Sequence, residues 1–110
     1  MNAAGLTFVL SGVVAALKHP SFEKLVTDGK ISQSEFHGTI ANLDAVLTTL
    51  RKTPQPAIEK MVAEFDDELT EHLTKFNLEW ISNDRLAAFR DAQNMAGYIT
   101  TVMAKSGLRE

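Results

Sequence analysis

The chain has 110 residues, of which 45% are hydrophobic, with a formal net charge of −3. This length fits one domain, and three prolines with six glycines are too few for a disordered chain. Without cysteine the chain forms no disulfide and no Cys-ligated zinc site, which fits a reducing, cytoplasmic location. The negative charge argues against a nucleic-acid partner, because phosphate binding needs a basic face.

The first predicted element is an apolar segment over residues 3–18, which includes the uncharged run AAGLTFVLSGVVAAL. No Lys or Arg precedes it, although a secretory signal normally carries one. It is also shorter than the ~20 apolar residues that cross a bilayer as a helix, so we expect no transmembrane segment. The segment is predicted to be a buried helix that stops before His19 and Pro20. A short second helix follows over residues 21–26, with Ser21 as its N-cap.

The stretch TDGKISQSEF resembles the second half of an EF-hand calcium loop, with Gly29 at the sixth position and Glu35 at the twelfth. The first and third positions fall on Lys24 and Val26, which offer no side-chain oxygen to a calcium ion. Ser32 and Glu35 have instead the spacing of a capping box. We therefore predict a glycine turn followed by the start of the third helix.

The clearest helical period belongs to the third helix, which ends at Arg51 and Lys52, where the helix dipole favours positive charge. Its apolar stripe comprises Phe36, Ile40, Leu43, Leu47 and Leu50. A fourth helix is predicted to begin with Thr53 as cap and Pro54 at the first helical position. Its stripe comprises Ile58, Val62, Phe65, Leu69, His72 and Phe76.

The remainder of the chain predicts one more helix and no strand. Residues 77–81 are interpreted as a connector, and any of residues 82–84 can cap the fifth helix. This helix is expected to run to about Ser106 and to end at Gly107 in a left-handed turn. The predicted fold class is therefore all-α: a compact bundle of four long helices plus one short helix, in a single domain over residues 1–110.

The fourth helix concentrates acidic residues and supplies three candidate metal ligands, Glu68, Glu71 and His72. Glu68 and His72 lie four residues apart and share a helix face. A di-metal site in a helical bundle uses a Glu-x-x-His pair, which is absent, and inward carboxylates from several helices, which we do not expect from the other helices. We therefore expect a solvated acidic face, with no metal and no cofactor. No nucleophile elbow, phosphate-binding glycine loop or HExxH motif indicates an enzyme.

The first and fifth helices carry more apolar surface than a small bundle is expected to cover, which predicts self-association. Gly12 and Ala16 would permit close helix contact. The predicted interface comprises Leu6, Val9, Leu10, Val13, Leu17, Met95, Ile99 and Val102. The alternative is that the first helix fills the core of a single chain.

These observations predict a non-enzymatic protein–protein interaction module, such as an adaptor, inhibitor or assembly subunit. We expect it to form a homodimer and to bind a protein partner that the sequence does not identify. Two alternatives remain. One is a metal-binding helical protein that uses the acidic fourth helix, and the other is a membrane-surface or secreted protein whose apolar amino-terminal segment inserts or is removed.

Overall fold

Helix formation dominates the computed structural model, which describes residues 1–108 and contains no strand among them. The predicted all-α bundle of four long helices and one short helix is confirmed. The five helices are α1 (Ala3–Leu17), α2 (Pro20–Thr27), α3 (Gln33–Lys52), α4 (Gln55–Ile81) and α5 (Arg85–Lys105).

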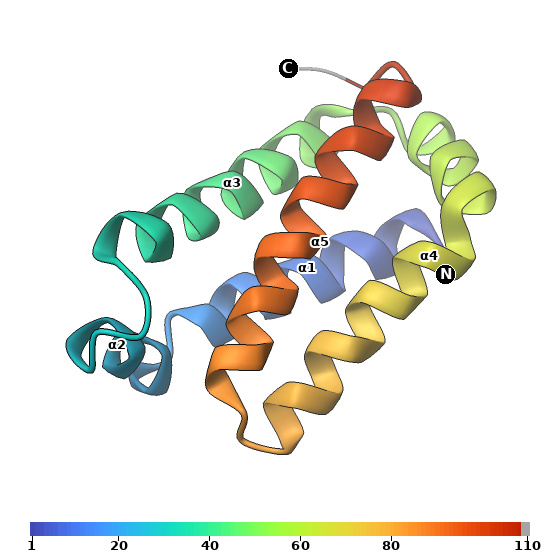
Figure 1. The fold of residues 1–110 in the computed structure, drawn as a ribbon. Coiled ribbons are helices and arrows are strands. Elements are labelled where there is room, and N and C mark those ends of the chain that lie inside the picture. Colours follow the sequence, from blue (N-terminus) through green and yellow to red (C-terminus); the bar gives the residue numbers. More distant parts are fainter. Residues whose placement is uncertain (109–110) are drawn as a thin grey trace.

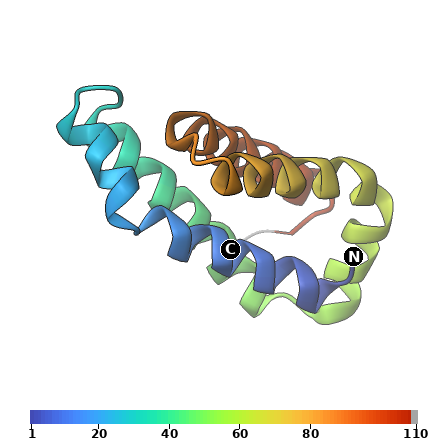
Figure 2. The same ribbon diagram turned by 90° about the horizontal axis from the view of Figure 1, so that it is seen from below.

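The helices form two layers, as Figure 1 and the view from below in Figure 2 show. One layer holds α1, α2 and α3, and the other is the hairpin of α4 and α5. The first turns of α4 lie beside the first layer, and α4 then bends into the second. The bend coincides with Phe65, whose φ of −115° and ψ of 20° are not helical. One long helix therefore belongs to both layers.

Helix α1 carries no charged residue and packs against α3 and α4. The buried residues of α1 are Ala3, Leu6, Leu10, Val13, Val14 and Leu17. Its amino-terminal end is held by polar groups, since Asn2 accepts a hydrogen bond from the Gly5 amide and Glu59 of α4 accepts one from the Ala3 amide. A carboxylate at this end of a helix also complements the helix dipole.

The turn between α2 and α3 has the geometry predicted from TDGKISQSEF. Gly29 adopts a φ of +74°, and both hydrogen bonds of the capping box between Ser32 and Glu35 are present. Lys24 binds Asp28 at 2.8 Å, so the residue aligned with the first position of a calcium loop neutralises the carboxylate aligned with the fifth. The segment is thus a turn and a helix start.

Three helix boundaries differ from the sequence prediction. The N-cap of α2 is His19, not Ser21, because the His19 ring accepts a hydrogen bond from the Ser21 amide while proline takes the first helical position. Pro54 is the N-cap of α4, one residue later than predicted. Residues 77–81 are not a connector but the last turn of α4. This turn makes α4 27 residues long, enough to pair with the length of α5.

The ends of α5 agree with the sequence. Asp84 caps the helix by accepting a hydrogen bond from the Ala87 amide at 3.1 Å. Gly107 follows the helix with a φ of +76°, the left-handed conformation predicted for its end. Both features are local, so residue type and spacing are sufficient to predict them.

A polar clasp joins α3 to α5 across the two layers. The Arg90 guanidinium donates to the Glu35 carboxylate at 2.6 Å, and the Gln93 amide donates to the same oxygen at 3.2 Å. The hydrogen bond from Arg90, and then those from Gln93 and the Ser32 amide, lower the pKa of Glu35 to about 2. Glu35 therefore caps its own helix and binds the neighbouring one.

A second inter-helix contact gathers around Trp80 near the end of α4. Its ring stacks on Phe22 of α2 at 5.6 Å between centroids, and His19 meets its edge at 5.7 Å. The Arg85 guanidinium lies 3.9 Å from the centroid of the Trp80 ring and donates to the Trp80 carbonyl. Arg85 also donates to Ser21 at 2.9 Å. These contacts of Trp80 with Phe22, His19 and Arg85, which we call the Trp80 corner, hold α2 against the turn between α4 and α5.

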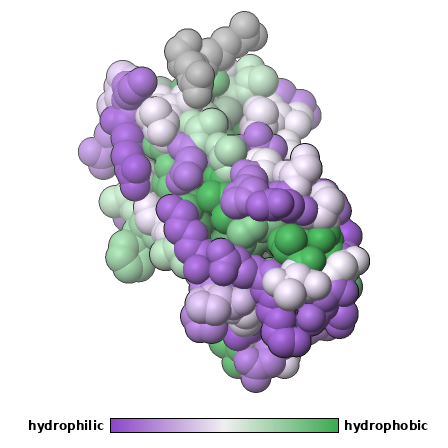
Figure 3. Space-filling model, turned by 90° about the vertical axis from the view of Figure 1, so that its left-hand side faces the viewer, coloured by the Kyte–Doolittle hydropathy of each residue, from purple (hydrophilic) through white to green (hydrophobic). Residues whose placement is uncertain are grey.

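The outside of the bundle is mixed in polarity. Figure 3 looks at the side that carries α2 and the start of α3, where hydrophobic residues form patches between hydrophilic ones. The large hydrophobic side chains that are exposed are Met1, Phe8, Leu78 and Ile81. Among residues 1–108 no single helix has the length and hydropathy of a membrane span. The pair α1 and α2 passes that test of length and composition together, with a bend of 50° between them.

The orientation of α1 can be tested with two truncations on the same helix. Leu10 is fully buried, whereas Phe8 is 80% exposed. We expect Leu10→Ala to lower the free energy of unfolding by about 2–5 kcal/mol, because it opens a cavity, and Phe8→Ala to change it by less than about 0.5 kcal/mol in dilute solution. Urea unfolding followed by circular dichroism measures both. Equal losses would contradict this orientation.

The clasp predicts an acid dependence of stability. Because the pKa of Glu35 falls from 4.5 to about 2 on folding, its carboxylate stabilises the folded state above pH 4.5. This contribution is lost as the pH falls through about 2. We expect Glu35→Gln to lose less stability than the unaltered protein between pH 5 and pH 2.5, in urea titrations at both values. The exposed Asp44→Asn serves as control and should behave like the unaltered protein.

Candidate functional site

The eight residues predicted to form a helix–helix interface lie mostly inside the single chain. Seven of them are buried: Leu6, Leu10, Val13, Leu17, Met95, Ile99 and Val102. Val9 is half-buried. The expectation that one chain cannot cover both apolar helices is therefore wrong for these residues. The reason is the length of α3 and α4, which pack along α1 and α5 and supply the neighbours that the sequence argument lacked.

One side of α1 stays exposed and carries no charged residue of its own, and the Arg51 guanidinium of α3 donates to Ser11 beside it at 3.2 Å. This α1 outer face consists of Ala4, Phe8, Gly12 and Ala15, at the spacing of one helix side. A Cβ atom added at Gly12 would meet nothing within 4 Å among residues 1–108 apart from the adjacent turns of α1 itself. Solvent-facing sides of helices normally carry charged or polar residues. The α1 outer face departs from that pattern, so it is a candidate interaction surface.

Beside Phe8 the surface is hollowed. A hollow of about 440 Å³ lies between the start of α1 and the connection from α3 to α4. It is lined by Ala3, Ala4, Thr7, Phe8, Thr53, Gln55 and Ile58. A protruding aromatic ring and a mainly apolar hollow thus occur side by side on one face.

A second candidate site is a pocket of about 320 Å³ between α4 and α5, which we call the α4–α5 pocket. It is lined by Glu68, Glu71, His72, Lys75, Asp91, Asn94 and Tyr98. The structure thus brings together the three candidate metal ligands, and adds partners from α5 that the sequence reasoning missed. Two of its walls are aromatic, since the His72 and Tyr98 rings stack with centroids 4.6 Å apart.

Asp91 is the most buried charged side chain of the pocket, with 8% of the residue exposed. One carboxylate oxygen lies 4.0 Å from the Lys75 ammonium, too far for a hydrogen bond, and the other has no hydrogen-bond partner within residues 1–108. Burial therefore raises the pKa of Asp91, and the charges of Lys75 and His72 only partly oppose this shift. The carboxylate is desolvated without full compensation.

Tyr98 has a similar environment. Its hydroxyl is buried and meets no hydrogen-bond partner at normal geometry in the described part of the chain. Burial first, and then the neighbouring Glu68 carboxylate, raise the pKa of Tyr98 to about 12. The hydroxyl is thus neutral at pH 7 and available as donor or acceptor. The pocket thus contains a carboxylate oxygen of Asp91 without a hydrogen-bond partner in the described residues, and a Tyr98 hydroxyl whose polar neighbour is the Glu68 carboxylate.

Metal coordination does not follow from this arrangement. Within residues 1–108, no group of three or more His, Asp or Glu side chains is placed to hold a metal ion. The acidic residues of α4 are instead divided among different contacts. Glu59 binds the start of α1, and Asp66 lies 3.3 Å from the ammonium group of Met1. Glu68 and Glu71 are exposed beside the α4–α5 pocket.

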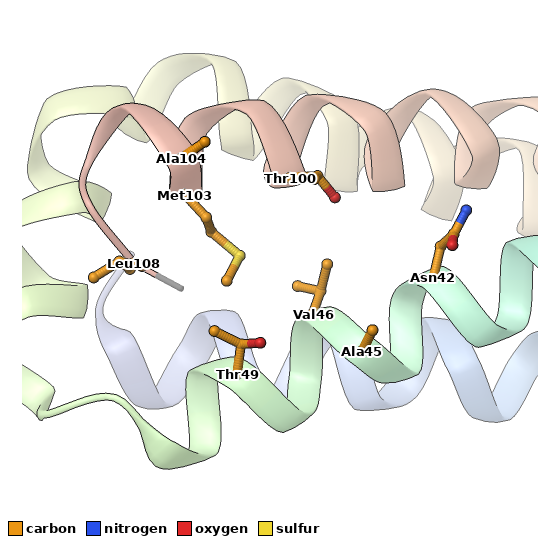
Figure 4. Close-up of a pocket in the computed structure, with 8 residues that line it drawn as sticks. All are labelled: Asn42, Ala45, Val46, Thr49, Thr100, Met103, Ala104 and Leu108. Carbon is orange, nitrogen blue, oxygen red and sulfur yellow. The ribbon is translucent and has the colours of Figure 1, made fainter. Parts of the chain in front are cut away.

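A third cavity is an apolar groove of about 460 Å³ between α3 and α5. Figure 4 shows its lining residues, from α3, α5 and the segment after α5: Asn42, Ala45, Val46, Thr49, Thr100, Met103, Ala104 and Leu108. Met103 and Val46 point toward each other across it. Its volume is that of a small-molecule site, although its polar groups do not converge on one point.

The sequence carried one signal for the missed residues. Asp91 stands among the apolar positions Ala88, Ala92 and Met95 of α5, where a buried helix side is expected. A carboxylate at such a position predicts a buried acid that needs a partner. Tyr98 and Asn94 gave no comparable signal, because their proximity to α4 depends on how the two helices are rotated.

No family model matches the chain, and the searches of curated proteins and of solved structures gave no match either. The function is therefore argued from the geometry of the α1 outer face and the α4–α5 pocket.

The environment of Asp91 predicts that its charge destabilises the fold at neutral pH. Because folding raises the pKa of this carboxyl above 3.8, stability is lost as the pH rises through the raised value. We expect Asp91→Asn to melt at a higher temperature than the unaltered protein at pH 7, and this advantage to disappear near pH 3. Thermal unfolding at both pH values measures it, with Asp67→Asn as an exposed control. A lower melting temperature at pH 7 would show that the Lys75 pair stabilises the fold.

Proposed function

We propose that the protein is a non-enzymatic interaction module that self-associates through the α1 outer face. The observation that carries the proposal is the exposure of Phe8, at 80%, in the middle of a helix that has no charged residue. A single exposed apolar residue is common on soluble proteins. An entire uncharged helix side with an aromatic ring at its centre is the pattern of a surface that is covered in use.

A second copy of the chain is the occupant that charge favours. The chain has a formal net charge of −3, so two copies repel each other through most of their surfaces. The α1 outer face contributes no charge to that repulsion. Identical copies can therefore meet there without placing their carboxylates in contact, with the Arg51 guanidinium at the edge of the face beside Ser11. Adaptor or assembly roles would use the remaining faces of the dimer.

The shape of the face also suits a symmetric pair. In a two-fold interface the same patch occurs on both copies, so a projection on one must fit a depression on the other. Phe8 and the hollow lined by Thr7, Thr53 and Ile58 provide both on one face. The open space at Gly12 allows a second helix to approach closely, since no side chain of its own chain fills it.

Solution mass tests the proposal. We expect sedimentation velocity at tens of micromolar to give the mass of two chains for the unaltered protein and of one chain for Phe8→Glu. The charge would be desolvated in the interface without a partner, which costs far more than the loss of the ring. Ile81→Glu is the matched control: Ile81 is 71% exposed at the end of α4 and lies outside the α1 outer face, so this variant should stay dimeric.

Three results would overturn self-association through this face. The unaltered protein could sediment as a single chain, Phe8→Glu could remain dimeric, or Ile81→Glu could dissociate. If the unaltered protein sediments as a single chain, flotation with liposomes tests whether the α1 outer face binds a membrane surface. Single chains that float with lipid, and lose that property in Phe8→Glu, would assign the α1 outer face to a membrane surface instead.

A further inference from the structure

The α4–α5 pocket combines an unsatisfied carboxylate oxygen with excess negative charge. One carboxylate oxygen of Asp91 is buried there without a hydrogen-bond partner within residues 1–108, and the buried hydroxyl of Tyr98 has the Glu68 carboxylate as its polar neighbour. Three carboxylates, those of Glu68, Glu71 and Asp91, line the pocket against the single ammonium of Lys75. Buried polar atoms are nearly always paired in proteins, so the unpaired oxygen of Asp91 in an acidic pocket points to a missing cationic ligand.

We propose that the α4–α5 pocket binds a primary alkylammonium ion, with Asp91 and Tyr98 as the groups that hold its nitrogen. An ammonium group has three donors and no acceptor. The buried carboxylate oxygen of Asp91 and the oxygen of Tyr98 supply acceptors once the side chains that cover them move aside, and the side-chain carbonyl of Asn94 is a third on the lining of the same pocket. The positive charge offsets the desolvated carboxylate.

The arrangement favours ammonium over the other common cations. A guanidinium is bound best by both oxygens of one carboxylate, but one oxygen of Asp91 already faces Lys75 at 4.0 Å. A metal ion needs several converging ligands, and residues 1–108 hold no such group. An ammonium ion is compact and can be bound by a single carboxylate oxygen, so it fits the remaining oxygen of Asp91.

The walls of the pocket suit the alkyl part of such a ligand. His72 and Tyr98 form a stacked pair of rings, whose faces and edges offer apolar contact to a methylene chain. Glu68 and Glu71 are exposed at the rim, where they attract cations and can bind a second amino group. This chemistry occurs in free polyamines and in the lysine side chain of a peptide.

Lys75 is the internal competitor for the same carboxylate. Its side chain is 63% exposed and its nitrogen stays beyond hydrogen-bonding distance of Asp91. The ion pair is thus incomplete and can be displaced by a better placed cation. Removal of the Lys75 charge should therefore strengthen ligand binding, whereas removal of the Asp91 charge should weaken it. A solvated acidic surface would respond weakly to both changes, and it would respond to Glu64→Gln as it does to Asp91→Asn.

The test is a nuclear magnetic resonance titration of the full chain at constant ionic strength. The probes are n-butylammonium, spermidine and Nα-acetyl-lysine methylamide, with tetramethylammonium as a cation that has no N–H donor. We expect the three amines to shift the resonances of Asp91, Asn94 and Tyr98 at millimolar concentration or below. Spermidine binding most tightly would indicate a free polyamine, and the lysine derivative binding most tightly would indicate a peptide side chain.

Two variants are expected to change the affinity for amines in opposite directions. We expect Asp91→Asn to weaken amine binding at least about tenfold, which corresponds to about 1.4 kcal/mol, and Lys75→Met to strengthen it at least about threefold. Glu64→Gln removes an exposed carboxylate of α4 outside the pocket and should leave the affinity unchanged. If Asp91→Asn does not fold, the Lys75→Met result decides.

The proposal is overturned by any of four results. The amines could leave these resonances unshifted up to about 10 millimolar, roughly ten times the ~1 mM dissociation constant of a weak site. Tetramethylammonium could bind as tightly as n-butylammonium. Asp91→Asn could weaken binding no more than Glu64→Gln does, or Lys75→Met could leave it unchanged. The pocket uses no residue of the α1 outer face, so each outcome is independent of self-association.

Discussion

The burial of α1, a helix without a charged residue, is the constraint on which the rest of the fold depends. Three sides of such a helix must be covered if the chain is to fold alone, because each exposed apolar residue forgoes hydrophobic stabilisation. The bundle meets this demand with α3 and with an α4 that spans both layers. The fourth side has no helix left to cover it, which is why the α1 outer face exists.

The two-layer arrangement also determines where the inter-helix contacts and cavities lie. The two layers share one apolar core, and the Glu35–Arg90 clasp and the Trp80 corner add polar and aromatic contacts between them. The apolar groove between α3 and α5 lies between the same two layers. Within the second layer, Asp91 interrupts the buried apolar residues of α5 and lines the α4–α5 pocket.

Features set by neighbours in sequence could be predicted, and those set by helix rotation could not. The capping box at Ser32, the cap at Asp84 and the left-handed Gly107 follow from residue type and spacing. The bend at Phe65 and the helical state of residues 77–81 depend on packing between layers. The acidic residues that line the pocket from α4 could be identified in the sequence. That they face Tyr98 depends on the rotation of α5 about its own axis, which the apolar periodicity of α5 does not fix closely enough.

The Trp80 corner gives the protein an internal optical reporter. Trp80 is the only tryptophan of the chain, and its indole is enclosed by a phenyl ring from α2 and the guanidinium of Arg85. The fluorescence emission of Trp80 therefore reports whether α2 is packed against α4, independently of the total helix content measured by circular dichroism. Detachment of α2 would move the indole into water while the four long helices keep their far-ultraviolet signal, so partial and complete unfolding acquire different spectroscopic signatures.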